Sequence, residues 1–309
     1  VQTCALPICV SFWRWMTALT VIIALVGVGI YASGGGEFEK RSAHIAKLKI
    51  SGIITGDEET LRLIREISES RAEAVILSIE SPGGTVTGAE ALYDALRKLA
   101  AKKPLVAVVD GMAASGGYIA ALGTDRIFAR ETSIVGSIGV LFQYPDIVGL
   151  LDRVGVKVES IKSSPLKAAP SPIESATPES RAAIAALVQE NFDWFKRLVR
   201  ERRGLDDAGL AAVADGRVFT GKQGVTLGLV DQLGAIDQAQ DWLEKEKKLP
   251  RDLPVREWRP HGFSEKWGLS GVARVSGFDR LADLMDRLAA TPQTQLLDGV
   301  LVLWHPSMP

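Results

Sequence analysis

The sequence predicts an α/β fold, in which parallel strands alternate with covering helices. Apolar runs at 74–79 and 104–109 predict strands, a further strand with a break at Gly52 is expected at 44–54, and a helical segment follows each of them. Strands that are apolar at nearly every position are typical of parallel sheets, because helices cover both faces of such sheets. Alternation of this kind favours a layered domain, which we place at residues 43–245.

Hydrophobic spacing and capping residues predict the elements between and after these strands. Asp57 is expected to cap a first helix, and a second helix is expected to begin at Thr85. Further strands are expected at 126–129, 138–142 and 156–161, with a helix at 146–154. A long helix at 180–202 is expected to turn six apolar side chains inward: Ile184, Leu187, Val188, Phe195, Leu198 and Val199.

Composition excludes several classes of function. The chain has 309 residues, 47% of them hydrophobic, so it can bury a large core. Its formal net charge of −1 gives no indication of nucleic-acid binding. Cys4 and Cys9 are the two cysteines, and both precede the predicted domain. A disulfide framework or a thiol nucleophile in that domain is therefore excluded.

The N-terminal region predicts a membrane anchor. Trp15 to Ala32 contains no charged residue over 18 positions, and as a helix it would be about 27 Å long, close to the thickness of a bilayer core. We assign 12–32 to a transmembrane signal anchor and 33–42 to a tether; a cleaved signal peptide is the alternative. The domain would then sit at the inner (cytoplasmic) membrane and face the periplasm or the cell exterior.

The first residues have a separate peculiarity. Residues 1–8 correspond to the translation of a string that is common in sequencing adapters, and the chain begins with Val rather than Met. We expect residues 1–11 to be an artefactual or incomplete N-terminus.

A small-residue stretch at 110–121 contains the candidate nucleophile, Ser115. The stretch follows the apolar strand 104–109 and opens a segment of helix-forming residues. A hydroxyl at a helix N-terminus has backbone amides behind it, and these favour developing negative charge. The alternative is that Ser115 is only a helix N-cap among packing glycines.

A second junction of the same type lies about thirty residues upstream. Gly83 and Gly84 follow the strand 74–79 within Glu80-Ser81-Pro82-Gly83-Gly84. Consecutive glycines can aim backbone amides into a crevice, and such amides stabilise the oxyanion of a tetrahedral intermediate. An ordinary Pro-Gly turn is the alternative.

A nucleophilic serine needs a base, and histidine is poorly placed to supply one. None of His44, His261 and His305 falls in a loop after a core strand. Lysine can replace histidine in this role, and the candidate is Lys167. Its loop, 163–172, is apolar and proline-rich, which would favour the uncharged amine by desolvation. Lys162 is the local competitor, and a solvated surface lysine is the alternative for Lys167.

Taken together, these motifs resemble the signal peptide peptidase A family of membrane-bound Ser-Lys proteases. The resemblance covers about 45–245. It rests on Ser81–Gly84, on 111–118, on a lysine 52 residues after the serine, and on the matches at 136–140, 172, 177–179, 216–221 and 228–231. It implies Ser115 as nucleophile, Lys167 as general base, and amides near Gly83, Gly84 and Gly116 as the oxyanion hole. Pro170 departs from the family, which often has glycine there.

The resemblance also implies a fold and a substrate class. It implies the repeated β-β-α fold of Clp protease and crotonase, without cofactor or metal. It further implies a homo-oligomer that degrades cleaved signal peptides and other membrane-released peptides, and it leaves open a dyad within one chain and a dyad shared between protomers. A crotonase-type acyl-CoA enzyme and a catalytically silent membrane scaffold are the alternatives. The tail 246–309, with its apolar stretch 296–304, has no assigned role.

Overall fold

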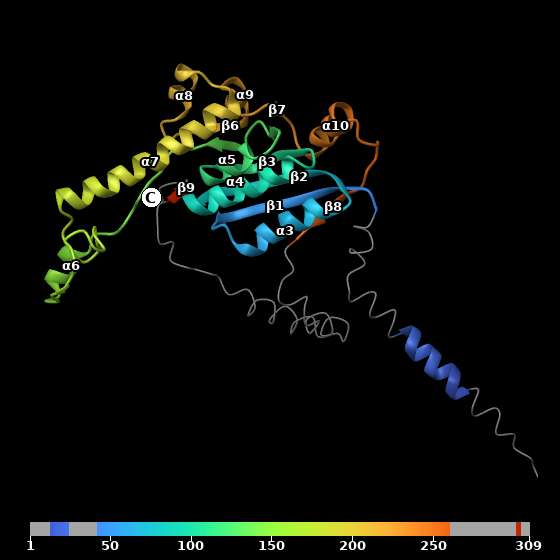
Figure 1. The fold of residues 1–309 in the computed structure, drawn as a ribbon, viewed down its shortest axis with the longest axis horizontal. Helices are drawn as coiled ribbons and strands as arrows, with labels where there is room; N and C mark the ends of the chain where they lie inside the picture. Colours follow the sequence, from blue (N-terminus) through green and yellow to red (C-terminus); the bar gives the residue numbers. More distant parts are fainter. Residues whose placement is uncertain (1–12, 25–41, 260–300, 304–309) are drawn as a thin grey trace, which may run out of the picture. The chain divides into compact units, whose positions relative to one another are not determined.

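The computed structural model describes residues 13–24, 42–259 and 301–303, and it divides the chain into two units. The first unit includes a helix at 13–24. The rest of the predicted 12–32 anchor lies outside the described residues, and none of the helices within them is long and apolar enough to cross a membrane. The second unit contains the described residues from His44 onward, and we call it the sheet unit (Figure 1).

Three long parallel strands form the centre of the sheet unit. β2 (Ala72–Thr85) lies between β1 (His44–Ile54) and β3 (Leu105–Ala114). Leu48 pairs with Leu77, and Leu77 pairs with Ala107. The β1–β2 register shifts between Ser51 and Ile53, where Gly52 has φ 72°.

Helices bury both faces of this sheet. Val75, Leu77 and Ile79 point into a core with α3 (Glu58–Glu69), α4 (Val86–Ala100) and α5 (Gly116–Leu122). The alternate residues Ala74 and Ile76 point into a smaller core beneath α10 (Ile236–Glu246). Side chains alternate between faces along a strand, so two covered faces require a strand that is apolar at both sets of positions. The predicted layered α/β architecture is confirmed (Figure 1).

Capping residues set the helix starts as the sequence predicted. The Asp57 carboxylate accepts a hydrogen bond from the Thr60 amide at 2.7 Å, and Thr85 accepts one from the Gly88 amide at 3.1 Å. Each bond satisfies an amide that has no partner within its helix.

Shorter strands complete the sheet on both sides. β5 (Ile134–Gly136) pairs with β3 and with β6 (Val218–Thr220), while β4 (Arg126–Ala129) pairs with β3 and β7 (Gln232–Leu233). On the far side, β8 (Val255–Trp258) runs parallel to β1, so the sheet continues into the segment assigned to the tail. Two small helices, α8 (Asp207–Val213) and α9 (Gly221–Thr226), lie between these strands in the sequence.

Residues 141–190 form an arm that leaves the sheet (Figure 1). It consists of α6 (Val148–Arg153), an irregular loop, and the first half of α7 (Pro178–Arg203). The strand predicted at 156–161 is wrong, because Val156, Val158 and Ile161 are exposed and pair with no strand of the described part of the chain. The strand predicted at 138–142 is also wrong, since the regular pairing in this region is at 134–136.

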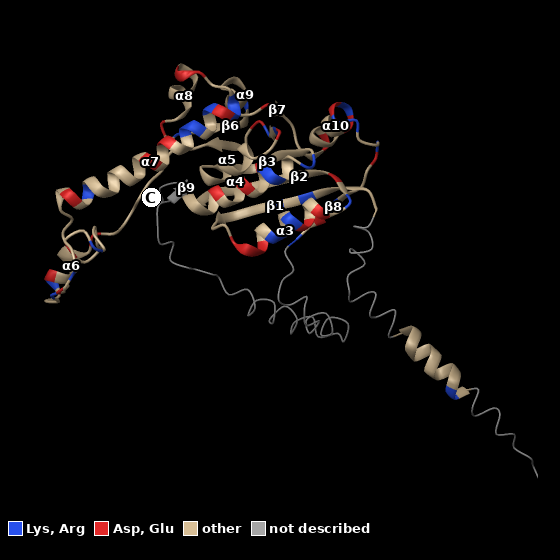
Figure 2. Cartoon of the chain, in the orientation of Figure 1, with Lys and Arg blue, Asp and Glu red and all other residues tan. Residues whose placement is uncertain are grey.

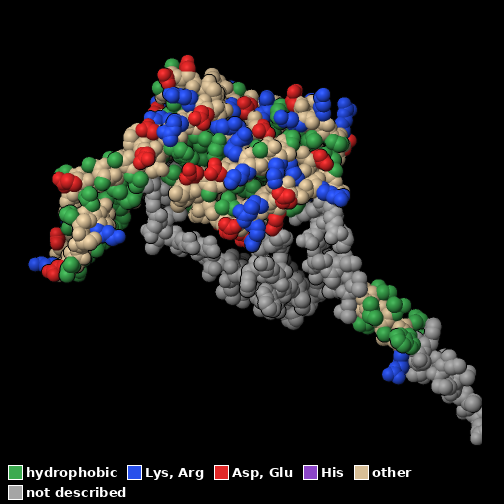
Figure 3. All heavy atoms as spheres, viewed as in Figure 1, with side chains coloured by type: hydrophobic (Ala, Val, Ile, Leu, Met, Phe, Trp, Pro, Cys, Tyr) green, Lys and Arg blue, Asp and Glu red, His purple; other side chains and the backbone are tan. Residues whose placement is uncertain are grey.

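The long helix α7 is buried only near its C-terminal end. Phe195, Leu198 and Val199 enter the core as predicted. Leu187 is 41% exposed, so the inward-facing stripe predicted for the first half of the helix is wrong there. Hydrophobic side chains are visible on the surface of the arm in Figure 3. Elsewhere charges of both signs are interspersed, without a face of one sign in this view (Figure 2).

A short strand from the end of the chain also joins the sheet. β9 (Leu301–Leu303) pairs antiparallel with the last residues of β2. Its register places Leu303 opposite Gly83 and Val302 opposite Gly84. The apolar stretch of the tail therefore contributes a strand at the glycines that the sequence singled out.

Candidate active site

Ser115 occupies a strained turn between β3 and α5. Its backbone has φ 55° and ψ −116°, a conformation that costs on the order of 1–3 kcal/mol in a residue with a side chain. Its amide donates to the Gly136 carbonyl at 2.8 Å, and its carbonyl accepts from the Tyr118 and Ile119 amides. The turn is thus held from both sides, as a sharp strand–turn–helix nucleophile position requires.

The side chain of Ser115 is buried and unpaired. The residue is 1% exposed, and its Oγ has no hydrogen-bond partner among the described residues. Ser115 occupies the N-cap position of α5, but its side chain makes no capping hydrogen bond to the helix. A buried hydroxyl without a partner costs free energy, and such a group in a strained turn is typical of a functional site.

Gly83 and Gly84 lie directly against the Ser115 turn. A Cβ on Gly116 would stand 3.1 Å from the Gly84 nitrogen and 3.3 Å from the Gly83 Cα. Both glycines belong to β2, so the prediction that this strand ends at residue 79 is wrong. A Cβ on Gly84 would stand 1.8 Å from the Ile54 carbonyl oxygen, and glycine is therefore required for this pairing with β1.

The two adjacent glycine amides are not equivalent. The Gly83 amide donates to the Ser81 Oγ at 3.1 Å, and that hydroxyl donates to the Gly52 carbonyl at 2.7 Å. The Gly84 nitrogen is the β2 atom nearest to Gly116. Gly116 opens α5, where a backbone amide has no partner within the helix.

Lys167 lies on the arm, apart from Ser115. Its side chain is exposed, and its backbone amide donates to the Ser164 carbonyl at 3.1 Å within the loop. The desolvating loop expected around it is therefore absent within a single chain, because neighbouring Leu166 is itself 48% exposed. One chain brings together Ser115, Gly83, Gly84 and Gly116 without Lys167.

The competing lysine is already engaged. Lys162 forms an ion pair with Glu174, and its side chain is only 19% exposed. The hydrogen bond from Lys162, followed by one from Ser160, lowers the pKa of the Glu174 carboxyl. Lys162 therefore stabilises the arm loop. Of these two lysines, Lys167 is the one whose amine is not engaged in an ion pair with a described residue.

Two further strained residues flank these candidates, and neither was predicted. Ser137 has φ 52° and follows Gly136, whose carbonyl holds the Ser115 amide. Ala168 has φ 55° and follows Lys167. Positive φ in residues other than glycine concentrates at functional sites. Neither could be predicted, because serine and alanine residues carry no local mark of a positive φ.

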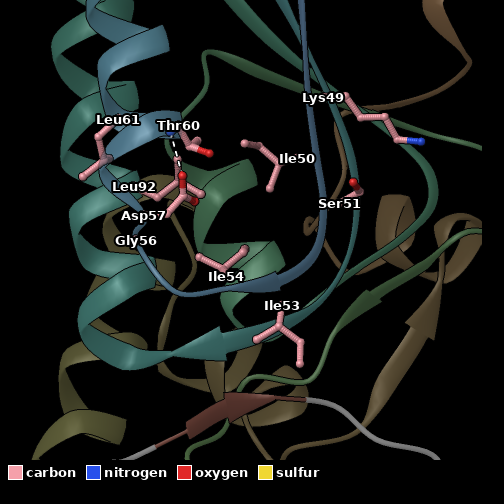
Figure 4. A pocket seen from close by; sticks show the side chains of 10 residues that line it. All are labelled: Lys49, Ile50, Ser51, Ile53, Ile54, Gly56, Asp57, Thr60, Leu61 and Leu92. Carbon is pink, nitrogen blue, oxygen red and sulfur yellow. Dashed lines mark hydrogen bonds between the residues drawn. The ribbon is translucent and has the colours of Figure 1, made fainter. Parts of the chain in front are cut away.

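A pocket of about 250 Å³ opens beside the end of β1 (Figure 4). Its lining is apolar at Ile50, Ile54 and Leu92, and Asp57 and Thr60 of the α3 start contribute polar atoms. Ser115 and Lys167 do not line it. Two of its lining residues, Ile53 and Ile54, pair with Gly83 and Gly84 of β2.

Comparison with known proteins decides the family. The profile of peptidase family S49 matches residues 97–250. A candidate signal peptide peptidase SppA of Enterococcus faecium is 32% identical over 283 residues, covering 83% of this chain and 81% of that protein. The chain belongs to peptidase family S49, the signal peptide peptidase A family.

Other relatives agree with this assignment. A candidate protease of Synechocystis is 35% identical over 64% of this chain and 72% of its own length. The chloroplastic serine protease SPPA of Arabidopsis thaliana is 30% identical over 79% of this chain and 37% of its own length. This S49 chain is accordingly a serine-type peptidase, and the matched region includes both Ser115 and Lys167.

Proposed function

We propose that this S49 peptidase is a membrane-anchored serine endopeptidase that uses a Ser115–Lys167 dyad. The observation that carries the proposal is the Ser115 hydroxyl, buried and unpaired in a strained turn, against the glycine backbone of β2. A silent scaffold has no need to maintain that combination, since strain and an unpaired hydroxyl both lower stability.

The chemistry follows from these groups. Ser115 Oγ attacks the substrate carbonyl, while uncharged Lys167 takes the hydroxyl proton and then delivers it to the leaving amine. The Gly84 and Gly116 amides stabilise the oxyanion, because the Gly83 amide already donates to Ser81. Water, activated by the same lysine, then hydrolyses the acyl-enzyme and releases the second product.

We infer that Lys167 acts on Ser115 of a neighbouring copy. Within one chain Ser115 Oγ lacks a partner among the described residues, and Lys167 is exposed on the arm. The arm also exposes apolar side chains, among them Leu150 at 60% and Val154 at 64%. A second copy packed on the arm would bury these side chains and would exclude water from Lys167, which favours the uncharged amine.

The peptide is expected to bind as a strand along the end of β2. β9 already pairs there in antiparallel register, so this edge accepts an extended backbone. Pairing at Gly83–Thr85 would carry a peptide past Gly116 and the Ser115 turn. Addition of a strand to an exposed edge is a general mode of peptide recognition.

The substrates proposed are signal-peptide remnants and other peptides released from the membrane, as the names of the relatives suggest. Anchoring through 12–32 in the inner membrane would keep the enzyme near such peptides. Cell fractionation, comparing the full chain with a variant lacking residues 1–36, tests the anchor: removal should release an active protein from membranes washed with salt and carbonate.

Labelling with a fluorophosphonate tests the catalytic assignment. The full chain should be labelled, Ser115→Ala should not, and hydrolysis of a fluorogenic peptide should disappear with the label. Equal labelling of Ser115→Ala would refute the nucleophile, and a chain that neither reacts nor hydrolyses peptides would be a scaffold. Thermal stabilisation by coenzyme A would instead support the acyl-CoA alternative.

A further inference from the structure

The base of α7 is tied to the helix that begins at Ser115. Arg202 donates from Nε to the Leu122 carbonyl and from Nη2 to the Thr124 carbonyl, both at 2.9 Å. These carbonyls lie at the C-terminal end of α5, where backbone acceptors have no helical partners. One end of α5 therefore carries Ser115, and the other end holds α7.

Arg203, the next residue, makes a denser set of contacts. Its Nε donates to the Gly228 carbonyl at 2.6 Å, and its two terminal nitrogens donate to the Asp231 carboxylate at 3.1 and 2.9 Å. The two side chains are only 12% and 26% exposed. Burial opposes the charge on Arg203, but the hydrogen bonds that it donates to Asp231 outweigh this effect, so the pKa of the guanidinium is raised. Bidentate geometry fixes direction as well as distance.

The partner of Arg203 is itself fixed to the sheet and to α5. Asp231 accepts from the Ile127 amide of β4 at 2.7 Å. The buried Tyr118 hydroxyl, in the first turn of α5, donates to the Leu229 carbonyl at 2.8 Å. The segment 228–231, which matched the family pattern without a role, thus joins α5, β4 and α7.

We propose that Arg203, through Asp231, is a positioning residue that sets the angle at which α7 leaves the sheet unit and so places Lys167. The proposal rests on the function proposed for Lys167. α7 extends about 39 Å from Arg203 to Pro178 at 1.5 Å per residue. A rotation of about 5° at its base would move its far end by about 3 Å, and errors of about 1 Å reduce catalysis about 100-fold.

Arg203→Lys tests this role, because it keeps the charge and removes the bidentate fork. The matched control is Arg200→Lys, one turn earlier, whose partner Asp207 is 91% exposed. We expect kcat for a fluorogenic peptide to fall at least tenfold in Arg203→Lys with KM changed less than threefold. In Arg200→Lys both values should stay within twofold. Assays use the full chain in detergent, well below the melting temperature, with the oligomer checked by light scattering.

A distance measurement separates positioning from simple destabilisation. Spin labels at Leu187→Cys on the arm and Glu66→Cys on α3, in a background without Cys4 and Cys9, report the arm angle by electron–electron resonance. Labelled chains are diluted with unlabelled ones so that only distances within a chain contribute. We expect a shifted or broadened distance distribution in Arg203→Lys and an unchanged one in Arg200→Lys.

Tyr118→Phe provides a second variant if Arg203→Lys fails to fold. It should lower kcat by about threefold and should also shift or broaden the distance distribution. An unchanged distance distribution in the folded variants would overturn the proposal, whatever the activity. An unchanged kcat would do so as well. Because the distances require no activity, activity retained by Lys167→Ala would refute the dyad and leave the test of the arm angle intact.

Discussion

The backbone nitrogen of Gly84 lies 3.1 Å from the point where a Cβ on Gly116 would stand. A real Cβ seldom approaches another atom so closely, so a side chain at residue 116 would displace the β2 backbone by a few tenths of an ångström. The two glycines come from different strand ends, 32 residues apart in the sequence. Their contact is what places two backbone amides beside Ser115.

Gly116→Ala is expected to lower kcat by about 10- to 100-fold, because it moves the proposed oxyanion donors, and losing one such donor costs about 100- to 1000-fold. The matched control is Gly111→Ala on β3, the strand that precedes Gly116. Its nearest neighbour would be the Glu80 Oε1 at 3.5 Å, an ordinary contact with a flexible side chain. Steady-state kinetics on folded protein decide the matter, and equal activity of the two variants would contradict the assignment.

Replacement of the nucleophile should abolish turnover without destabilising the fold. Ser115→Ala removes a buried hydroxyl that has no partner among the described residues, and Ser115→Gly also relieves the strain at φ 55°. We expect the free energy of unfolding to stay level or to rise by about 1 kcal/mol. Urea unfolding of both variants measures this change.

The control for that experiment is Ser133→Ala, another buried serine. Its hydroxyl donates to the Val109 carbonyl at 2.8 Å and accepts from the Arg130 amide at 3.1 Å. Its loss should cost about 1–3 kcal/mol, because both partners are left unpaired. If Ser115→Ala is as destabilising as Ser133→Ala, the hydroxyl has a structural partner in solution and the argument from strain fails.

The two lysines of the arm loop should respond differently to alanine substitution. Lys167→Ala is expected to reduce kcat at least 1000-fold with the oligomer intact, since the general base is lost. Lys162→Ala breaks only the ion pair with Glu174 and should keep activity within about threefold, with a small loss of stability. Peptide hydrolysis and light scattering provide the two readouts, and the reverse order of activities would make Lys162 the base.

Mixing two inactive variants tests whether the dyad is shared. Ser115→Ala and Lys167→Ala chains, once exchanged into common oligomers, should regain part of the activity. A complete dyad forms wherever the intact Ser115 of a Lys167→Ala chain meets the intact Lys167 of a Ser115→Ala chain. The same mixture kept below the exchange temperature is the control. Absence of any recovery after exchange has been demonstrated with labelled chains would place the dyad within a single chain.

Removal of residues 294–309 is expected to raise kcat/KM severalfold for an extended peptide. β9 and such a peptide would compete for the Gly83–Thr85 edge, and a tethered strand competes at an effective concentration that can reach the millimolar range. A synthetic peptide of residues 296–304 should then inhibit the shortened enzyme competitively, while a scrambled peptide should not. If neither the removal of residues 294–309 nor the added peptide changes the kinetics, β9 does not block this edge.

Local pattern predicted the core strands and helices well, because their apolar periodicity reflects burial that the sheet unit provides. It failed where pairing overrides local preference. Ser-Pro-Gly-Gly indicates a turn by composition, yet Ile53 and Ile54 pair with Gly83 and Gly84 and extend the strand. It also failed where no neighbour exists, since the alternating valines of 156–161 find no strand beside them.

The site was predictable as a set of residues but not as an arrangement. Ser115 and the glycines were identified from two strand–helix junctions, and parallel topology brings such junctions to one edge of a sheet. The separation of 52 residues in sequence between Ser115 and Lys167 does not determine how far apart the two side chains lie in space. The placement of Lys167 on an exposed arm could therefore not be predicted. Positive φ at Ser115 and Ser137 was equally invisible, because it depends on contacts made from outside the turn.

The edge of β2 beside Ser115 recognises backbone rather than side chains, as its pairing with β9 illustrates. Hydrogen bonds to amides and carbonyls are the same for nearly every amino acid, so this edge by itself discriminates poorly between sequences. It discriminates strongly between conformations, because helical or folded segments have already used those groups internally. A peptidase built on such an edge would spare intact neighbours and would act on chains that have lost their structure.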